Sequence, residues 1–475
     1  MHIKIIATIG PSSSSKEILK EMVLRGVRIF RLNFSHNTPK GFIPIIETIR
    51  ELESELGIPI TIMGDLSGPK IRIGEVKNSP LYLGKGYKAI LGIESFREKY
   101  EDREVPFLGI KIKEAIQGLK IGMKVILSDG IPIFRVEEVL DPDKVYLLEV
   151  ESGGSVSSNK GINFPGKHIS LPALTETDKK NLHEAMEIGI DAFALSFVQN
   201  KQDIIDIKNE IQKHNKFVPV IAKLERANGV ENLNEILEIA DGIMVARGDL
   251  GLECPLSSLP IIQKRIINAC NRQHKPAIVA TQMLLSMVHN PLPTRAETTD
   301  VANAIMDGAD CLMLSDETAV GNYPIEAINI IKEIAQNTED YIFEHQKEPL
   351  KPIHEIDPGS YLAYSACLLA NYANAKGIAC HSTSGKTARL ISSCRPKQKI
   401  YGLTPHMEVI KYLNFMKGVI PILSDANIPN HLDRVENFVQ HSNIFKPGDK
   451  IIITSGQPTP GQLEKHTNQI KIYFK

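Results

Sequence analysis

Short apolar runs of strand length recur along most of the chain, and stretches with helical periodicity separate most of them. Eight such runs are found: Ile3–Gly10, Val27–Ser35, Ile58–Asp65, Ala192–Phe197, Val218–Glu225, Gly242–Asp249, Ala277–Thr281 and Cys311–Glu317. Strands that alternate with helices pair in parallel, and eight such units can close into one barrel. We therefore predict an α/β fold built on a (β/α)8 TIM barrel, with a doubly wound open sheet as the competing topology.

The alternation breaks once, between the third and fourth runs. Short strand candidates with turn signals replace it there: Leu81–Leu91, Val125–Val136 and Lys144–Val150. They predict an all-β domain inserted after the third barrel strand. The Gly- and Pro-bounded connection 159–166 that leads back to the barrel predicts a hinge, and hence a lid over the barrel mouth.

A second change in pattern begins at about residue 348. A helical stretch is followed there by five alternating strand candidates: Gly377–Ser382, Lys399–Thr404, Gly418–Ile422, Lys450–Ser455 and Gln469–Phe474. These predict a separate α/β domain. The chain then divides into a barrel built from residues 1–69 and 168–346, a β lid of residues 70–167, and a C-terminal α/β domain of residues 347–475.

Two carboxylates close neighbouring runs, Glu225 the fifth and Asp249 the sixth. From parallel strands they would project at one rim, where functional groups of such barrels gather. Mg²⁺ (or Mn²⁺) suits this pattern, because it binds one or two protein carboxylates and keeps other positions for water and substrate phosphate. Lys223 would share a face with Glu225, while Leu224 points into the opposite layer. Taken alone, this Lys-x-Glu pattern is equally compatible with a structural ion pair.

Further polar groups lie at the ends of other runs. Arg31, Asn33 and Ser35 alternate along the second run and offer a planar cation, an amide and a hydroxyl to an oxygen-rich ligand such as phosphate. The third, seventh and eighth runs end in or near Asp65, Lys70, Arg72, Thr281, Ser315 and Glu317. These residues add two cations to the same rim, together with hydroxyls and a carboxylate suited to proton transfer.

Composition narrows the possible functions. The 475 residues include 55 Lys and Arg against 56 Asp and Glu, a formal charge of -1, so nothing suggests a nucleic-acid binder. No apolar run approaches the length of a membrane span, and the first residues lack the pattern of a secretion signal. We expect a cytoplasmic protein without membrane contact. Its six cysteines show no zinc or redox spacing and are expected to be reduced.

Six motifs make the whole chain resemble the pyruvate kinase family. They are TIGPSS at 8–13, RLNFSH at 31–36, LPALTE at 171–176, IMVARGDLG at 243–251, ATQML at 280–284 and PTRAE at 293–297. The resemblance implies transfer of the phosphoryl group of phosphoenolpyruvate to ADP, giving pyruvate and ATP in the last step of glycolysis. It also implies a barrel with a nucleotide lid, a regulatory C-terminal domain and a homotetramer, with residues 293–297 near a subunit contact.

The same resemblance assigns roles to the rim residues. Glu225 and Asp249 would hold the divalent ion, and Lys223 would neutralise the transferring phosphoryl group. The substrate contacts it implies are Arg31, Lys223, the backbone of Ala246, Arg247 and Gly248, Asp249 and Thr281. The catalytic residues it implies are Lys223, Arg31 and Arg72, with a proton relay through water, Thr281, Ser315 and Glu317. The nucleotide contacts it implies are Pro11, Asn33, His36, Arg72 and Lys160.

Residues 68–70 read Gly-Pro-Lys, where many potassium-dependent members of the family have Gly-Pro-Glu. Lys70 brings an ammonium group of its own, and Leu66 and Ile73 stand where the potassium-dependent members have polar residues. We therefore predict that Lys70 replaces the monovalent cation and that K⁺ is not required. The region concerned comprises Asn33, Ser35, Asp65 and Leu66.

A second phosphate site is predicted in the C-terminal domain. The segment Ser382, Thr383, Ser384, Gly385, Lys386, Thr387 follows a predicted strand and opens a helix, so its amides and hydroxyls could cradle a phosphate. It resembles the family's effector loop, and we expect a sugar phosphate or nucleotide activator. A plain helix cap is the alternative. The loop is not a Walker A motif, because Cys380 stands where that motif needs glycine.

Two other functions fit parts of the pattern. A magnesium-dependent aldolase or mutase acting on pyruvate or phosphoenolpyruvate could use the same barrel and carboxylates, but it would lack a nucleotide lid. A catalytically inactive metabolite sensor built around the C-terminal domain is the non-enzyme alternative. All the expected catalytic groups are present in the chain, which favours an enzyme.

Overall fold

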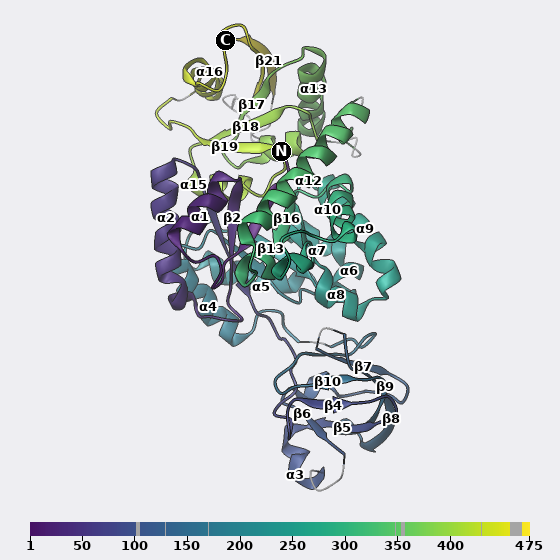
Figure 1. Cartoon of the computed structure of the whole chain (residues 1–475). Helices are drawn as coiled ribbons and strands as arrows, with labels where there is room; N and C mark the ends of the chain where they lie inside the picture. Colours follow the sequence, from purple (N-terminus) through teal and green to yellow (C-terminus); the bar gives the residue numbers. More distant parts are fainter. Residues whose placement is uncertain are drawn as a thin grey trace.

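A closed barrel of eight parallel strands forms the middle of the molecule (Figure 1). The strands are β1 (Lys4–Thr8), β2 (Val27–Asn33), β3 (Thr61–Leu66), β12 (Ala192–Leu195), β13 (Val220–Leu224), β14 (Gly242–Ala246), β15 (Ala277–Ala280) and β16 (Cys311–Leu314). Because β16 pairs with β1, the predicted barrel is confirmed and the open sheet is excluded. Most strands end before the predicted runs do, since the polar residues at the ends of the runs lie in loops.

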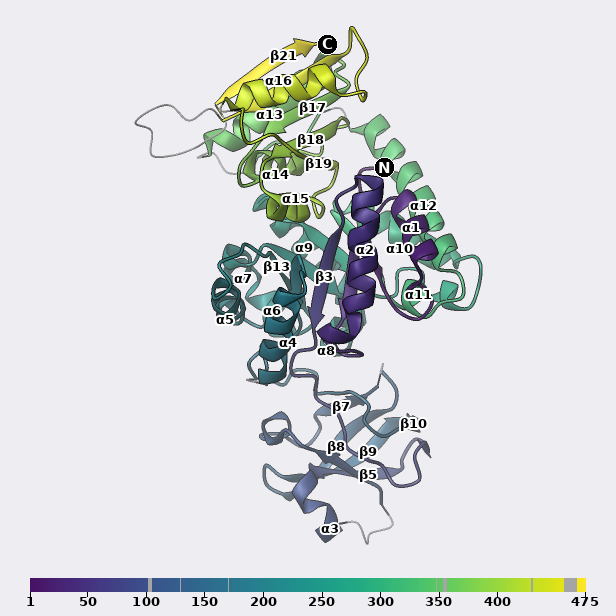
Figure 2. The same ribbon diagram turned by 90° about the vertical axis from the view of Figure 1, so that its left-hand side faces the viewer.

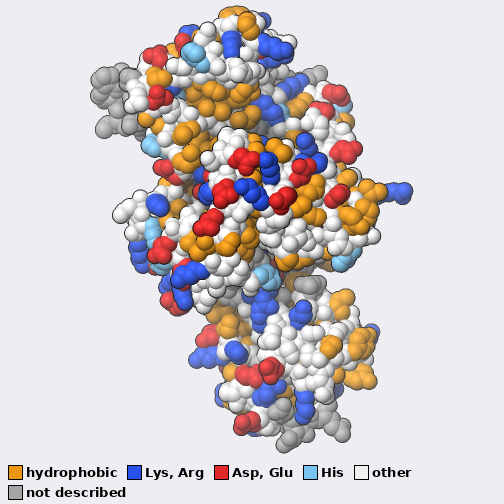
Figure 3. Space-filling model, turned by 60° about the vertical axis from the view of Figure 1, so that its left-hand side comes forward, with side chains coloured by type: hydrophobic (Ala, Val, Ile, Leu, Met, Phe, Trp, Pro, Cys, Tyr) orange, Lys and Arg blue, Asp and Glu red, His pale blue; other side chains and the backbone are white. Residues whose placement is uncertain are grey.

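The structure is a computed structural model. It describes residues 1–100, 105–128, 130–169, 171–346, 348–352, 357–428, 430–456 and 468–475. In the part of the chain so described, no helix is long and apolar enough to cross a membrane. Acidic and basic side chains are interspersed over the barrel face seen in Figure 3, in keeping with the near-zero net charge.

Helices cover the outside of the barrel (Figure 2). They are α1 (Lys16–Leu24), α2 (Ile43–Leu56), α4 (Glu176–Glu187), α5 (Lys201–Gln212), α6 (Ala227–Glu231), α7 (Leu233–Ile239), α8 (Arg247–Glu253), α9 (Leu259–Arg272), α10 (Arg295–Met306), α11 (Asp316–Ala319) and α12 (Pro324–His345). The helix predicted at 16–24 is confirmed, and the Ser15 hydroxyl caps it by accepting a hydrogen bond from the Ile18 amide.

The inserted domain contains a six-stranded sheet in the order β11-β7-β8-β9-β5-β6 and a separate pair, β10 with β4. Its elements are β4 (Leu81–Leu83), β5 (Lys88–Ile93), α3 (Arg97–Tyr100), β6 (Phe107–Ile110), β7 (Lys124–Leu127), β8 (Ile133–Asp141), β9 (Val145–Ser152), β10 (Gly154–Val156) and β11 (Ile162–Asn163). The runs 81–91 and 125–136 each form two strands, not one. Turns with positive φ at Gly86, Ser128 and Gly130 interrupt them.

The C-terminal domain is a five-stranded sheet in the order β19-β18-β17-β20-β21, in which only β21 is antiparallel. Its elements are α13 (Pro358–Tyr372), β17 (Gly377–His381), α14 (Lys386–Ser393), β18 (Lys399–Thr404), α15 (Met407–Leu413), β19 (Val419–Leu423), α16 (His431–His441), β20 (Lys450–Ser455) and β21 (Gln469–Phe474). All five predicted strands are present. Tyr412 and Phe415 pack against the residues inside the barrel. They close the end of the barrel that faces the C-terminal domain.

Glu339 of α12 ties the start of the chain to the barrel. Its carboxylate accepts hydrogen bonds from the backbone amides of His2 and Ile3, both at 2.6 Å. Burial opposes the ionised form, but the bonds to His2 and the charge of Lys417 outweigh it and lower the pKa of Glu339 to about 2. A carboxylate held in this way stabilises the folded chain at neutral pH.

The Glu339→Gln variant is expected to lower the free energy of unfolding at pH 7 by about 3 kcal/mol, since each pKa unit corresponds to about 1.4 kcal/mol. A carboxyl group whose pKa is lowered in the folded state stabilises the fold at pH values above 4.5, its pKa in the unfolded chain. This contribution disappears as the pH falls towards 2. Urea unfolding should therefore show a difference from the parent that shrinks over this range. Glu344→Gln, at an exposed position of the same helix, is the control. A pH-independent difference would contradict this account.

Candidate active site

A buried charge cluster lies at the carboxyl ends of β3, β12 and β13. The Lys223 amine lies 3.0 Å from Asp65 Oδ1, 2.6 Å from Ser196 Oγ and 3.1 Å from Glu225 Oε1. Lys223, Asp65 and Glu225 are only 9%, 1% and 3% exposed. Lys223 and Glu225 therefore share a face as predicted, and Leu224 packs in the core between barrel and helices.

The charged groups of this cluster shift one another's pKa values. Burial would lower the pKa of Lys223, but the charges of Asp65 and Glu225 outweigh it and raise that pKa. Burial would raise the pKa of Asp65, yet Lys223 and Arg31 lower it. For Glu225, burial together with the charges of Asp249 and Asp65 raises the pKa despite the neighbouring Lys223. A cation placed beside Glu225 would favour the ionised form of this carboxylate.

Glu225 and Asp249 form an oxygen donor set that fits a divalent cation. Glu225 Oε2 accepts a hydrogen bond from the Phe197 amide at 2.8 Å, which fixes the carboxylate. Asp249 lies in the first turn of α8, and its side chain is 26% exposed. No group of three or more His, Cys, Asp and Glu that could hold a metal occurs among the described residues. Two carboxylates suit Mg²⁺ or Mn²⁺, whose other ligands come from water and phosphate.

Arg31 joins the cluster from β2. Its Nε donates to Asp65 Oδ2 at 2.6 Å and its Nη1 to Thr8 Oγ1 at 3.1 Å. The guanidinium is therefore held in a fixed direction beside the Lys223 amine. Sequence reasoning missed Thr8 and Ser196, although both carry the signal that revealed the others, a polar residue at or near the end of an apolar run.

In the predicted monovalent-cation region, Asn33 of β2 lies opposite Asp65 of β3. Strand β2 ends at Asn33, so Ser35 lies in a turn, where its amide donates to Asn33 Oδ1 at 3.1 Å. The expectation that Ser35 shares a strand face with Arg31 and Asn33 is therefore wrong. The Leu66 side chain lies in the outer core. The Lys70 amine lies 3.4 Å from Asp249 Oδ1, where it balances that carboxylate.

Thr281 follows β15 in a strained turn, with a φ of 67° that is uncommon for a β-branched residue. Its Oγ1 donates to the Ala280 carbonyl at 2.6 Å and accepts the Gly248 amide at 2.9 Å. The Arg247 side chain supports this turn, because Nη2 donates to the Thr281 carbonyl at 2.7 Å and Nη1 pairs with Asp300 at 2.6 Å. The turn from Ala246 to Gly248 is thus bonded directly to Thr281.

Ser315 and Glu317 follow β16, but they do not continue it, because the chain turns into α11. The strand predicted over Cys311–Glu317 therefore ends earlier than expected, at Leu314. Glu317 is 1% exposed, and burial raises its pKa. Its carboxylate accepts the Ser315 amide at 2.7 Å and the Leu284 amide at 3.0 Å. Glu317 thereby links the loop that follows Thr281 to Ser315.

The predicted nucleotide contacts are divided between barrel and lid. Pro11 and His36 are exposed in the loops after β1 and β2. Arg72 and Lys160 lie on the lid side, where Arg72 Nη1 donates to the Asn159 carbonyl at 3.0 Å. The lid lies at the end of the barrel opposite the C-terminal domain (Figures 1 and 2). Among the described residues, no hydrogen bond or ion pair joins Arg72 or Lys160 to the cluster at Lys223.

The predicted effector loop connects β17 to α14. Gly385 precedes the helix with a φ of 75°, and Ser382 Oγ accepts the Thr387 amide at 3.2 Å. The remaining polar side chains of the loop, Thr383, Ser384 and Lys386, are exposed. His381 Nδ1 and Ser455 Oγ, on adjacent strands beside the loop, are buried and have no hydrogen-bond partner among the described residues.

Comparison with known proteins covers nearly the whole chain. A family model described as pyruvate kinase, barrel domain, matches residues 1–328, and one described as pyruvate kinase, alpha/beta domain, matches residues 361–473. Pyruvate kinase 2 of Synechocystis sp. is 39% identical over 471 residues, which cover 95% of this chain and 76% of the relative. The pyruvate kinase of Thermococcus litoralis is 38% identical over 476 residues, 98% of each chain. That of Thermotoga maritima is 35% identical over 480 residues, 99% of this chain and 98% of the relative.

Proposed function

Because the chain belongs to the pyruvate kinase family, a family of phosphotransferases, we propose that it transfers the phosphoryl group of phosphoenolpyruvate to ADP at the barrel mouth. The buried cluster of Lys223, Asp65 and Glu225 carries this proposal. A buried amine and two carboxylates at the ends of parallel strands form a preorganised charged site, which exceeds what a structural ion pair needs.

Phosphoryl transfer passes through a loose state with charge spread over three equatorial oxygens, so positioning and positive charge supply most of the acceleration. The Lys223 amine meets these oxygens from a position held by Asp65 and Ser196. Arg31 adds a second cation, which Asp65 and Thr8 orient. Glu225 and Asp249 would hold a divalent ion, which would supply further positive charge to the transferring group. Arg72 joins this clamp when the lid closes.

The substrate carboxylate binds at the turn formed by Ala246, Arg247 and Gly248. The Gly248 amide, which donates to Thr281 Oγ1 in this structure, exchanges that acceptor for the carboxylate. After transfer, the enolate takes a proton from water at its methylene carbon. Thr281 and Ser315 stand on the two loops that Glu317 joins, and they direct the water that delivers this proton.

The nucleotide binds between barrel and lid. Pro11, Asn33 and His36 lie on the barrel rim, and Arg72 and Lys160 approach with the lid. Closure brings cations to the phosphates of ADP and excludes water from the transferring group. Formation of ATP from phosphoenolpyruvate and ADP, measured with luciferase, tests the proposed function. Consumption of phosphoenolpyruvate without ATP formation would indicate an aldolase or mutase, and no turnover would indicate a sensor.

We also propose that the enzyme works without K⁺. Lys70 already places an ammonium group at the mouth, 3.4 Å from Asp249 Oδ1. The rate is expected to stay within about twofold when KCl is replaced by tetramethylammonium chloride, because a covalently attached cation needs no dissolved substitute. Lys70→Met should be slow in tetramethylammonium and should recover with KCl. A parent enzyme that stops without K⁺ would refute the proposal.

Three wider assignments rest on the family. We propose that the loop Ser382–Thr387 binds a phosphorylated activator, since its hydroxyls and the Lys386 amine surround a helix start. Beside it, His381 Nδ1 and Ser455 Oγ have no hydrogen-bond partner in the part of the chain that the structure describes. We propose a homotetramer with residues 293–297 near a subunit contact. A cytoplasmic location follows from the role in glycolysis.

A further inference from the structure

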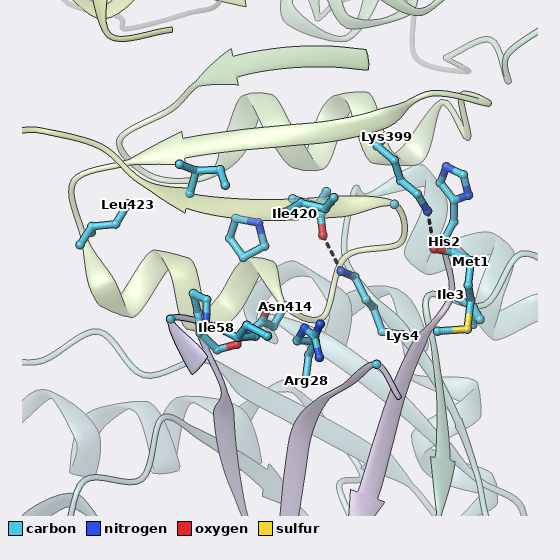
Figure 4. Close-up of a pocket in the computed structure, with 17 residues that line it drawn as sticks. Met1, His2, Ile3, Lys4, Arg28, Ile58, Lys399, Asn414, Ile420 and Leu423 are labelled. Carbon is cyan, nitrogen blue, oxygen red and sulfur yellow. Dashed lines mark hydrogen bonds between the residues drawn. The ribbon is translucent and has the colours of Figure 1, made fainter. Parts of the chain in front are cut away.

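A cavity of about 520 Å³ lies at the end of the barrel opposite the active site, between the starts of β1 and β2 and strand β19 of the C-terminal domain (Figure 4). Two lysines and an arginine, Lys4, Lys399 and Arg28, line it together with His2. None of the described residues that line it is acidic. Much of the remaining wall is apolar and includes Ile58 and Ile420. The cavity thus has basic side chains on part of its wall and apolar side chains on another part.

Backbone carbonyls, not carboxylates, hold the three cations. The Lys4 amine donates to the Val419 carbonyl and the Lys399 amine to the Met1 carbonyl, as Figure 4 shows. Arg28 Nη1 donates to two backbone carbonyls, at 2.7 and 2.8 Å. In the described part of the chain, none of the three forms an ion pair with Asp or Glu. The charge of Glu339 favours the charged form of Lys4 and of Lys399, but Glu339 does not line the cavity.

Burial disfavours the charged form of all three groups. Burial, followed by the charges of Arg28 and Lys399, lowers the pKa of Lys4 to about 7. Burial also lowers the pKa of Arg28 and that of Lys399. Charged groups removed from water are normally paired, and a bound anion would supply the missing partner here. The arrangement is the reverse of the Lys223 cluster, where carboxylates surround the amine.

We propose that this cavity binds a small organic phosphate monoester, with its phosphate at Lys4 and Arg28 and its organic part against the apolar wall. An ammonium and a planar guanidinium together provide the charge and the directed donors that phosphate oxygens accept. The volume lies in the range of small-molecule sites. The site is separate from the barrel mouth and from the Ser382–Thr387 loop, so it goes beyond the proposed catalytic function.

The position of the cavity connects it to both domains. The Lys4 amine already bridges β1 of the barrel to Val419 of β19. Strands β1 and β2 carry Thr8 and Arg31 at their other ends, where the two side chains are joined at 3.1 Å. A ligand between Lys4 and Arg28 therefore contacts the same two strands that hold Arg31 at the active site.

Calorimetric titration with phenyl phosphate tests the proposal, in a buffer with chelator and without divalent ions. The parent is expected to bind, and Lys4→Met and Arg28→Leu should each weaken binding about tenfold or more, because each removes a charge-assisted bond. Lys386→Met, which removes an amine from the effector loop, should leave this affinity unchanged. Binding that persists in both cavity variants, or no binding by the parent, would overturn the proposal.

A third variant tests the cavity without removing a hydrogen bond between the two domains. Ile420 is 37% exposed on the cavity wall, so Ile420→Asp adds a repelling carboxylate without removing a bond, and it should weaken phenyl phosphate about tenfold. Benzyl alcohol, which shares the ring but has no charge, should not bind. Benzoate, a carboxylate with the same ring, tests whether the cavity binds carboxylates or phosphates. If it binds more tightly than phenyl phosphate, the site takes carboxylates and the phosphate assignment is wrong.

Discussion

The Lys223→Met variant is expected to lower kcat by about a thousandfold, because removing a preorganised charge from a transferring group costs about that much. Lys223 lies within 3.1 Å of both Asp65 and Glu225, so no other side chain can take its place without rearranging the cluster. Steady-state kinetics with phosphoenolpyruvate and ADP measure the effect. The loss should appear in kcat more than in KM, since the amine acts mainly on the transition state.

Folding must be measured together with this rate, because Lys223→Met leaves the buried Glu225 without its cation and leaves Asp65 with Arg31 alone. Urea unfolding and circular dichroism show whether the variant is folded at the assay temperature. Lys208→Met is a matched control. Its amine, on α5, pairs with Asp241 at 2.9 Å away from the mouth, so kcat should be unchanged. A folded Lys223→Met variant that keeps a tenth or more of the parent kcat would contradict the assignment.

The Asp249→Ala variant is expected to raise the Mg²⁺ concentration for half-maximal rate about a hundredfold or more, since even loss of an outer partner of a metal ligand costs ten- to a hundredfold. Asp249 is one of the two carboxylates that we propose as ligands of the divalent ion, and its charge contributes to the raised pKa of Glu225. Rate against Mg²⁺ concentration and Mn²⁺ binding by electron paramagnetic resonance measure the effect. The second readout does not depend on turnover.

Glu253→Gln is the matched control for Asp249→Ala. Glu253 lies at the end of the same helix α8, and burial, with a contribution from the Asp249 charge, raises its pKa to about 7. The group is therefore about half ionised at neutral pH, and its replacement removes part of a negative charge near Asp249 without removing a proposed ligand. Equal losses of Mn²⁺ affinity in the two variants would mean that net charge, not ligation by Asp249, holds the ion.

Local patterns in the sequence were sufficient to predict the barrel and the five strands of the C-terminal domain. Both follow from apolar runs of strand length, whose period does not depend on distant contacts. The shared face of Lys223 and Glu225 was predictable for the same reason. The predictions failed where a strand ended early, at Ser35 and at Ser315–Glu317, because a turn cancels the two-residue alternation.

Only the tertiary structure decided which groups meet. Lys223 bonds Asp65 and Ser196 because three strands distant in sequence end at one rim, and barrel closure, not any motif, sets that register. The cavity of Lys4, Arg28 and Lys399 shows this still more clearly, since no pattern joins these positions until the C-terminal domain docks on the barrel. Periodicity determines which side of an element a residue occupies. Packing over the whole chain determines its neighbours, and the neighbours set the charge and the chemistry.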